Sequence, residues 1–509
     1  MTGPLAERLR ALLAAATAAY AGTPEQETLR AMSRRLDDPL RVAIAGRVKA
    51  GKSTLLNALL GERLAATDAG ECTRVVTWYT HGVASRAWAH PRGAPPRQLP
   101  FDVRDGQTEL ELGGLRAEDL DRLVVEVPSA RLERLVLIDT PGVGSLSAEV
   151  SARTTAAMGA SGTAAAAEGA PVADAVLYLM RHLHATDVSF LESFHDSQFA
   201  GVTPVNAIGV LSRADEVGAG RADAIDLAGR VAADYRRDPR VRGLVQTVLP
   251  VAGLLAQAAA GLRERDYAAL SALAGAGAVG EALVLSADRF VAPVPDSPVE
   301  LGVRHELLAA FGLSGVRLSL ALIRGGLVAD SGALARELRR RSGLDALRGA
   351  LLTQFTERRD LLKAQAALGA VERVLAARSV PGSDRLRSQV ESVLVGAHEL
   401  TELRLLNDLR TGVVELAAPD LSEQAEALLG ITGVDARSRL RLPADAPEED
   451  LRPAVIAALR RWQRRGESPI ADAATRRVAA VLRRTCEGLL TATAPSPTST
   501  PARPTVNLR

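Results

Sequence analysis

Short apolar runs alternate with amphipathic stretches through the first half of the chain. The first run, 40–46 (LRVAIAG), is rich in branched aliphatic residues and ends in glycine. Similar runs cover 75–80, 123–127, 135–138, 175–180, 207–211 and 247–251. Strands that alternate with helices are typical of an α/β domain with a mostly parallel sheet. The pattern therefore predicts an α/β domain over residues 39–260.

Helical periodicity replaces the strand pattern in the second half. Residues 261–490 are rich in Ala, Leu, Arg and Glu at helical spacing. One long helix is predicted over 343–378 and a second over 384–416, joined by a Pro-Gly turn at 381–382. Two long amphipathic helices joined in this way indicate an all-α elongated bundle or stalk.

The two ends of the chain and its most apolar stretch complete the predicted organisation. Helices over 5–20 and 25–36 need a partner for their apolar faces, so residues 1–38 are expected to pack on the bundle. The Pro/Ser/Thr-rich end, 491–509, is predicted to be disordered. Arginines and a Gly-Gly pair interrupt the apolar stretch 316–328, and no transmembrane helix is expected.

Composition narrows the range of partners. The 62 Lys and Arg residues nearly balance the 60 Asp and Glu residues, which disfavours a nucleic-acid partner. Two cysteines are too few for a disulfide scaffold and suit a reducing cytosol.

Only Lys49, Lys52 and Lys363 are lysines, so a lysine marks a position where a compact ammonium group is needed.

Residues 46–53 (GRVKAGKS) match the phosphate-binding pattern G-x-x-x-x-G-K-S/T between a predicted strand and a predicted helix. Its glycines let backbone N–H groups surround phosphate oxygens, and the helix N-terminus adds partial positive charge. Lys52 is expected to reach the β- and γ-phosphates, and the Ser53 hydroxyl is expected to ligate Mg²⁺. The expected phosphate-binding residues are Gly46, Lys49, Ala50, Gly51, Lys52, Ser53 and Thr54.

A second motif, D-T-P-G, begins at Asp139 directly after an apolar run. Open α/β sheets bind ligands at the carboxyl ends of their strands, where Asp139 is expected to hold Mg²⁺. The N–H of Gly142 is expected to bond the γ-phosphate and to release it on hydrolysis. After a phosphate-binding loop, this motif favours a GTPase over an ordinary ATPase.

A threonine between the two motifs has a candidate catalytic role. Thr73 follows Lys52 by 21 residues, so its hydroxyl can reach Mg²⁺ and its carbonyl can reach the attacking water. Thr67 and Thr77 are alternatives for this role, and a plain loop threonine is another interpretation.

The segment 210–215 (VLSRAD) provides a base-reading candidate. Asp215 would accept hydrogen bonds from N1 and N2 of guanine, whereas adenine would leave the carboxylate unpaired. Ser212 and Arg213 depart from the usual [NT]-K-x-D pattern, although a flat guanidinium can stack over a base. Gly253, after the next strand, is expected to close the base pocket. A surface loop with an incidental aspartate is the alternative.

These motifs, followed by a helical bundle, resemble the dynamin superfamily of large GTPases. The segments GRVKAGKSTLLNALLGE, TRVVTWYTHG, VLSRADEVGAGR and SGLDALRGALLTQF are similar to actinobacterial dynamin-like proteins of the isoniazid-inducible Ini group. The similarity extends over residues 5–490. It implies a cytoplasmic, Mg²⁺-dependent enzyme that hydrolyses GTP to GDP and remodels or maintains membrane at the inner face of the plasma membrane.

The same resemblance implies a set of partners. These are a second copy through the GTPase domains, a paralogous dynamin-like protein, and anionic lipids bound peripherally. A candidate lipid-contacting tip is 376–384, and a plain helical turn is the alternative interpretation of that segment. The alternative function is a regulatory switch whose helical region binds a protein partner without remodelling lipid.

The chain departs from the family around the phosphate-binding motifs. Eukaryotic dynamins place a Gln and a Ser where this chain has Val48 and Lys49. Directly after D-T-P-G, Val143 leaves no glutamine in the position that small GTPases use. We therefore expect backbone groups of Thr73 and Gly142 to hold the attacking water, and Lys49 to supply positive charge in cis or across a dimer. Slow basal turnover that rises on dimerisation follows from this arrangement.

Overall fold

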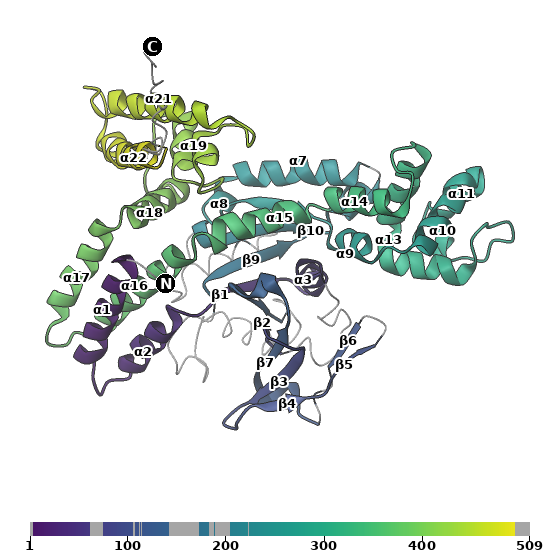
Figure 1. Cartoon of the computed structure of the whole chain (residues 1–509), viewed down its shortest axis with the longest axis horizontal. Helices are drawn as coiled ribbons and strands as arrows, with labels where there is room; N and C mark the ends of the chain where they lie inside the picture. The colour runs from purple at the N-terminus through teal and green to yellow at the C-terminus, as the bar shows by residue number, and fades with distance from the viewer. Residues whose placement is uncertain are drawn as a thin grey trace, which may run out of the picture. The chain divides into compact units, whose positions relative to one another are not determined.

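A computed structural model describes residues 4–61, 75–104, 107–110, 112, 114–141, 173–182, 188, 204–221 and 223–493 (Figure 1). Most of the end that is predicted to be disordered, from residue 494 onward, lies outside these ranges. Packing divides the chain into two compact units, Met1–Val393 and Leu394–Arg509. The predicted boundaries at residues 38, 260 and 490 stay predictions.

A nine-stranded sheet forms the centre of the first unit. Its strands are β1 (Leu40–Gly46), β2 (Thr77–His81), β3 (Arg86–Pro91), β4 (Arg97–Leu99), β7 (Leu120–Val127), β8 (Leu135–Asp139), β9 (Ala175–Met180), β10 (Ala207–Ser212) and β11 (Val248–Val251). A separate pair consists of β5 (Phe101–Arg104) and β6 (Gln107–Leu110). The order of the large sheet is β11-β10-β9-β1-β8-β2-β7-β3-β4.

Strands β8, β1, β9, β10 and β11 form a parallel series within this sheet. Strands β9 and β10 are buried at every position, as expected for strands covered on both faces. Strand β2 is antiparallel to β8, and β3 is antiparallel to both β7 and β4. The predicted fold class, an α/β domain with a mostly parallel sheet plus a helical region, is confirmed, with an extension on one side that contains antiparallel pairs and the parallel pair β2–β7.

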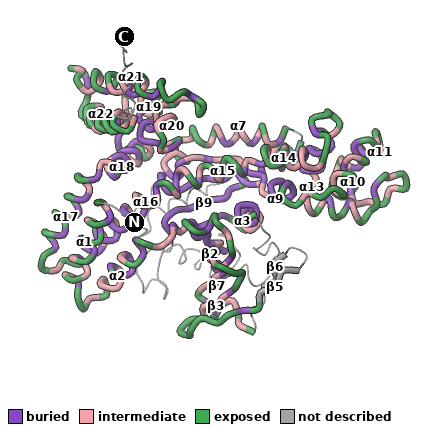
Figure 2. The backbone as a smooth tube through the Cα atoms, in the orientation of Figure 1, coloured by how far each residue is buried: buried purple, intermediate pink, exposed green. Residues whose placement is uncertain are grey.

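Helices after the last strand share one core with the sheet. They are α9 (Gly253–Gly261), α10 (Glu264–Gly275), α11 (Gly277–Leu283), α12 (Ala287–Phe290), α13 (Leu301–Arg324) and α14 (Ser331–Arg341). One buried apolar cluster extends from Val176 in β9 through Leu255 and Phe311 to Leu338. Figure 2 shows the buried strands and the buried faces of these helices. Residues 253–341 are therefore part of the first unit's core.

Helix α13 is, among the described residues, the one helix long and apolar enough to cross a membrane by length and composition. A core helix can have the same composition. Phe311, Val316 and Leu320 of α13 lie in the buried cluster shared with the sheet. Packing within the protein therefore accounts for part of the apolar character of this helix, since 44% of its apolar window is buried.

The prediction of one uninterrupted helix over 343–378 is wrong. The segment consists of α15 (Leu344–Ala350), a π-helical turn (Leu351–Thr356) and α16 (Arg359–Ala377). Gln354 is buried in the π-helical turn and hydrogen-bonds the side chain of Gln246. A buried polar group needs a partner, and the altered helical turn accompanies this contact.

The prediction of a second long helix over 384–416 is also wrong. It is divided into α17 (Ser383–Gly396) and α18 (His398–Thr411) because Ala397 adopts extended backbone angles. The apolar periodicity continues through the break, so sequence spacing gives no sign of it.

The second unit contains α18, α19 (Pro419–Leu428), α20 (Ala436–Leu440), α21 (Glu448–Gly466) and α22 (Ala473–Ala492). Trp462 of α21 and Leu482 of α22 are buried where these two helices pack together. Glu402 of α18 accepts hydrogen bonds from Arg439 and Thr485, which ties α18 to α20 and α22.

Helices α1 (Pro4–Ala19) and α2 (Glu25–Arg35) pack against α16 in the first unit. A buried cluster of charges joins α2 and α16 to the sheet. The carboxylate of Asp174, just before β9, lies 2.7 Å from Nη2 of Arg35 and 3.7 Å from Nζ of Lys363. It also accepts a hydrogen bond at 2.8 Å from the backbone N–H of Arg41 in β1.

Burial alone would raise the pKa of Asp174, but Arg35, Lys363 and the Arg41 N–H together hold it below its usual value. Burial lowers the pKa of Lys363 to about 8, although Asp174 opposes that shift. The carboxylate is therefore ionised and links α2, α16, β1 and β9.

Replacing Asp174 by Asn should strongly destabilise the first unit. The substitution removes the negative charge that faces two buried cations, a change that costs about 3–5 kcal/mol. Urea unfolding followed by circular dichroism measures the loss. The control is Asp384→Asn. The Asp384 side chain is 99% exposed in its ion pair with Arg387, so this substitution should leave the free energy of unfolding unchanged. An Asp174→Asn protein as stable as the wild type would contradict this account.

Candidate nucleotide-binding site

The loop between β1 and α3 (Lys52–Leu60) has an unusual backbone. Gly46, Lys49 and Gly51 have φ angles of 146°, 62° and 90°. A Cβ atom on Gly46 would lie 2.4 Å from the carbonyl oxygen of Leu179, so only glycine fits there. The loop leads directly into the N-terminus of α3, which is the arrangement that binds phosphate groups.

Lys52 and Ser53 occupy the first turn of α3. The ammonium group of Lys52 donates hydrogen bonds at 3.2 Å to the carbonyls of Gly46 and Arg47. Burial lowers the pKa of Lys52, and the charge of Asp139 partly offsets that effect. The ammonium group is therefore held over the loop, beside the start of the helix.

Asp139 ends β8, next to β1 in the sheet. Burial raises its pKa to about 6, although Lys52 and a hydrogen bond from Ser53 act in the opposite direction. The Ser53 hydroxyl lies 3.4 Å from Oδ2 of Asp139. Within the described part of the chain, the buried Oδ1 atom has no hydrogen-bond partner. Carboxylate and hydroxyl oxygens are the ligands that Mg²⁺ prefers, so this pair fits a magnesium ion.

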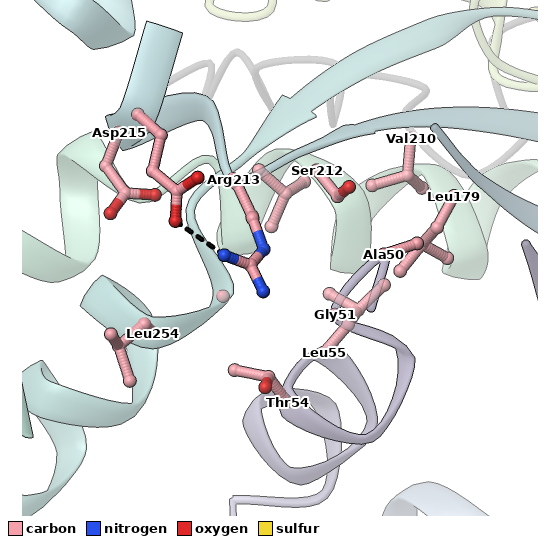
Figure 3. A pocket seen from close by; sticks show the side chains of 13 residues that line it. Ala50, Gly51, Thr54, Leu55, Leu179, Val210, Ser212, Arg213, Asp215 and Leu254 are labelled. Carbon is pink, nitrogen blue, oxygen red and sulfur yellow. Dashed lines mark hydrogen bonds and ion pairs between the residues drawn. The ribbon is translucent and has the colours of Figure 1, made fainter. Parts of the chain in front are cut away.

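A pocket of about 130 Å³ lies beside the loop (Figure 3). Its lining comes from the start of α3, the ends of β9, β10 and β11, the segment just after β10 and the start of α9. Its lining residues are Ala50, Gly51, Thr54, Leu55, Leu179, Val210, Ser212, Arg213, Asp215, Glu216, Val251, Gly253 and Leu254. Apolar walls with a few polar groups are typical of small-molecule sites.

Asp215 is the buried acid of this pocket. Burial raises its pKa to about 6, and the charge of Glu216 acts in the same direction, while its own backbone N–H and Arg213 oppose the shift. Figure 3 shows the Arg213 side chain extending between Asp215 and the loop. A carboxylate kept in such surroundings is a candidate for ligand recognition.

The other predicted base-pocket residues have distinct positions. Ser212 lines the pocket, but its hydroxyl donates a hydrogen bond to the carbonyl of Met180 at 3.2 Å and so links β10 to β9. Arg213 has a left-handed backbone and ion-pairs with Glu216 at 2.8 Å. Gly253 lies at the start of α9, where an added Cβ would be 3.4 Å from the Thr54 methyl carbon.

Sequence reasoning missed Glu216 and Arg181. The Glu216 carboxylate accepts from Arg181 at 2.7 Å and from Arg213 at 2.8 Å, which fixes Arg213 beside the pocket. Arg181 directly follows β9, and residues at the carboxyl ends of parallel strands commonly face the ligand. That position was the signal that could have identified Arg181.

The predicted catalytic residues Thr73 and Gly142 lie outside the described part of the chain, as do the alternative Thr67 and the neighbouring Val143. Thr77 begins β2 directly opposite Asp139, and its hydroxyl donates to the carbonyl of Val75 at 3.3 Å. Val48 and Lys49 are exposed at the outer part of the phosphate-binding loop.

Comparison with known proteins adds an independent line of evidence. Residues 42–207 match the model of the Dynamin family. The chain is 38% identical over 493 residues to the isoniazid-induced protein IniC of Mycobacterium tuberculosis, covering 95% of this chain and 98% of IniC.

Two further relatives match shorter segments. The isoniazid-induced protein IniA of Mycobacterium tuberculosis is 34% identical over 155 residues, which is 28% of this chain and 23% of IniA. A bacterial dynamin-like protein of Nostoc punctiforme is 34% identical over 120 residues, which is 21% of this chain and 17% of that protein.

Replacing Asp215 by Asn should stabilise the ligand-free protein at neutral pH. The folded pKa of about 6 exceeds the ordinary value of 3.8, so stability falls as the pH rises from about 4 to about 6, and the full penalty of ionisation remains at higher pH. Removing that penalty should raise the free energy of unfolding by about 1–3 kcal/mol at about pH 7.5. It should add nothing below about pH 4, where Asp215 is protonated in both the folded and the unfolded state.

Thermal unfolding in EDTA between about pH 4 and 8 measures this difference. Asp234→Asn is the matched control, because Asp234 is exposed in an ion pair with Arg237. A stability gain that persists unchanged at the acid end of this range would contradict the role of ionisation.

Proposed function

Because this chain belongs to the dynamin family, alongside the isoniazid-induced protein IniC, it is a GTP-hydrolysing enzyme, and we propose that it couples hydrolysis to self-assembly and membrane remodelling or maintenance at the inner face of the plasma membrane. The observation that carries the nucleotide assignment is the position of two buried acids beside one loop. Asp139 lies near the Lys52 ammonium group, and Asp215 lines the pocket that also contains Ala50 and Gly51. One loop can therefore contact both the phosphates and the base.

In the proposed complex, the loop binds the phosphates and the pocket binds guanine. Lys52 contacts the β- and γ-phosphates, while Ser53 and Asp139 hold Mg²⁺, which neutralises the developing phosphate charge. Asp215 accepts hydrogen bonds from guanine N1 and N2, and Arg213 stacks over the base. The remaining proposed contacts are Gly46, Lys49, Ala50, Gly51, Thr54, Ser212 and Gly253.

In the proposed reaction, water attacks the γ-phosphorus and the bond to the β–γ bridging oxygen breaks. Backbone groups of Thr73 and Gly142 position that water, and the Thr73 hydroxyl completes the metal ligands. Lys52 stabilises the negative charge that develops on the transferred group. The products are GDP and inorganic phosphate.

We propose that Lys49 supplies additional charge, either within one molecule or across a GTPase-domain dimer. The exposure of Lys49 and of its apolar neighbour Val48 supports this proposal, since a second molecule can reach both. Lys49 also has a left-handed backbone, with φ of 62°, a conformation that is concentrated at functional sites.

Membrane contact in this proposal is peripheral and depends on charge. The candidate tip at 376–384 contains Arg378, which ion-pairs with Glu25 at 3.2 Å. Nearby Arg387 pairs with Asp384 at 2.7 Å. These acids reduce the positive charge available to anionic lipids, so lipid contact should be weak and salt-sensitive. The alternative, a regulatory switch that binds a protein partner, predicts no lipid binding.

Replacing Lys52 by Ala should lower kcat/KM for GTP at least about 100-fold, because charge stabilisation at the phosphates is lost. Asp215→Ala should instead raise KM and abolish the preference for GTP over ATP. Phosphate release in GTP/ATP competition measures both effects. Strong competition by ATP in the wild-type enzyme would contradict guanine recognition by Asp215.

Turnover per molecule should rise with protein concentration if a dimer completes the site, and Lys49→Ala should abolish that rise. The control is Arg47→Ala, which removes a neighbouring exposed cation from the same loop. Phosphate release over a concentration series, with and without anionic liposomes at low and high salt, is the measurement. A rate independent of concentration and of lipid would favour the regulatory switch.

A further inference from the structure

The segment that follows Asp215 has an unfavourable backbone. Gly218, Ala219 and Gly220 are consecutive left-handed residues, with φ of 63°, 63° and 66°. Alanine seldom adopts this conformation, because its Cβ atom crowds the following carbonyl. The turn is also close to the pocket acid, since a Cβ on Gly220 would lie 3.4 Å from the Asp215 carbonyl oxygen. Such a turn requires support from outside itself.

Arg317 of α13 supplies that support. Its Nη1 atom donates to the carbonyls of Ala219 and Gly220, each at 3.1 Å. Its Nε and Nη2 atoms donate to the carbonyls of Val284 at 2.8 Å and Leu285 at 2.9 Å. All three guanidinium nitrogens are therefore used, and they join the turn to the loop between α11 and α12. A lysine ammonium group does not have this planar fork of donors.

Close packing fixes the turn against the same helix. A Cβ on Gly220 would lie 2.3 Å from the hydroxyl oxygen of Ser314, so α13 touches the backbone there. The helix itself is held firmly, because Phe311 and Val316 are buried in the core shared with the sheet. The part of α13 that contacts the turn follows Gly312, whose φ of 64° interrupts the helix, and Val316 anchors this part in the core.

We propose that Arg317 is a positioning residue for base recognition: it holds the turn at 218–220 and thereby keeps Asp215 in place to read guanine. The inference rests on the proposed role of Asp215. It assigns to α13, which the sequence placed in a helical stalk, a role in nucleotide selectivity.

Inosine triphosphate is a suitable probe because its base lacks the exocyclic amine of guanine and can give Asp215 only one hydrogen bond. The wild-type enzyme should therefore prefer GTP over ITP in kcat/KM. Arg317→Gln should raise KM for GTP about five- to tenfold, leave kcat nearly unchanged and reduce the GTP/ITP preference. A purely structural role would lower the active fraction, and hence kcat, equally for both nucleotides.

Matched variants separate positioning from general stability. Arg324 of the same helix donates to the carbonyl of Ala274 at 3.0 Å, so Arg324→Gln removes a similar contact that ties α13 to α10. It should leave the GTP/ITP preference unchanged. Ala219→Gly removes the backbone penalty at the turn, so the double variant Arg317→Gln/Ala219→Gly should regain part of the preference.

The outcomes distinguish this inference from the function on which it rests. Asp215→Ala should lose the GTP/ITP preference. If Asp215→Ala loses it while Arg317→Gln keeps both the wild-type KM and the wild-type preference, only the positioning role of Arg317 is overturned. If Asp215→Ala retains the preference, base reading by Asp215 fails and this inference fails with it. Arg317→Lys, measured in parallel with thermal unfolding, should show an intermediate preference in a folded protein.

Discussion

The contact between Gly46 and the carbonyl of Leu179 is the constraint on which the nucleotide site depends. It lets the end of β1 lie directly against β9, with no room for a side chain between them. Gly46 begins the phosphate-binding loop, and Leu179 forms a wall of the neighbouring pocket. The position of these two strands therefore sets the spacing between the proposed phosphate-binding half and the proposed base-binding half of the site.

The two acids of the site oppose folding, which is consistent with a role in binding. Both Asp139 and Asp215 have a pKa raised to about 6 by burial. Asp174 has the opposite character, because buried cations hold its pKa below the usual value. The protein thus contains buried acids of two kinds. Asp174 is compensated by cations and links helices to the sheet, whereas Asp139 and Asp215 lack comparable compensation, as expected for acids that bind a ligand.

The features that sequence reasoning identified are local, whereas those that it missed depend on contacts between distant segments. The loop at 46–53 and the acids Asp139 and Asp215 each lie at or just after the end of an apolar strand, so spacing alone identifies them. By contrast, Gln246 meets Gln354 inside a helix predicted to be regular. Arg317 likewise reaches a turn nearly a hundred residues earlier in the chain. A one-dimensional pattern records that a residue is charged, but not which distant carbonyl or carboxylate it meets. Roles for Thr73 and Gly142 stay predictions.

The scarcity of lysine has a practical consequence for labelling. Lys363 is buried, and the Lys52 ammonium group is engaged with two carbonyls, whereas Lys49 is exposed. Amine-directed fluorophores and crosslinkers should therefore react, besides the chain's α-amino group, mainly at the rim of the phosphate-binding loop. Ordinary acylation chemistry thus offers a site-selective reporter there without any engineered cysteine.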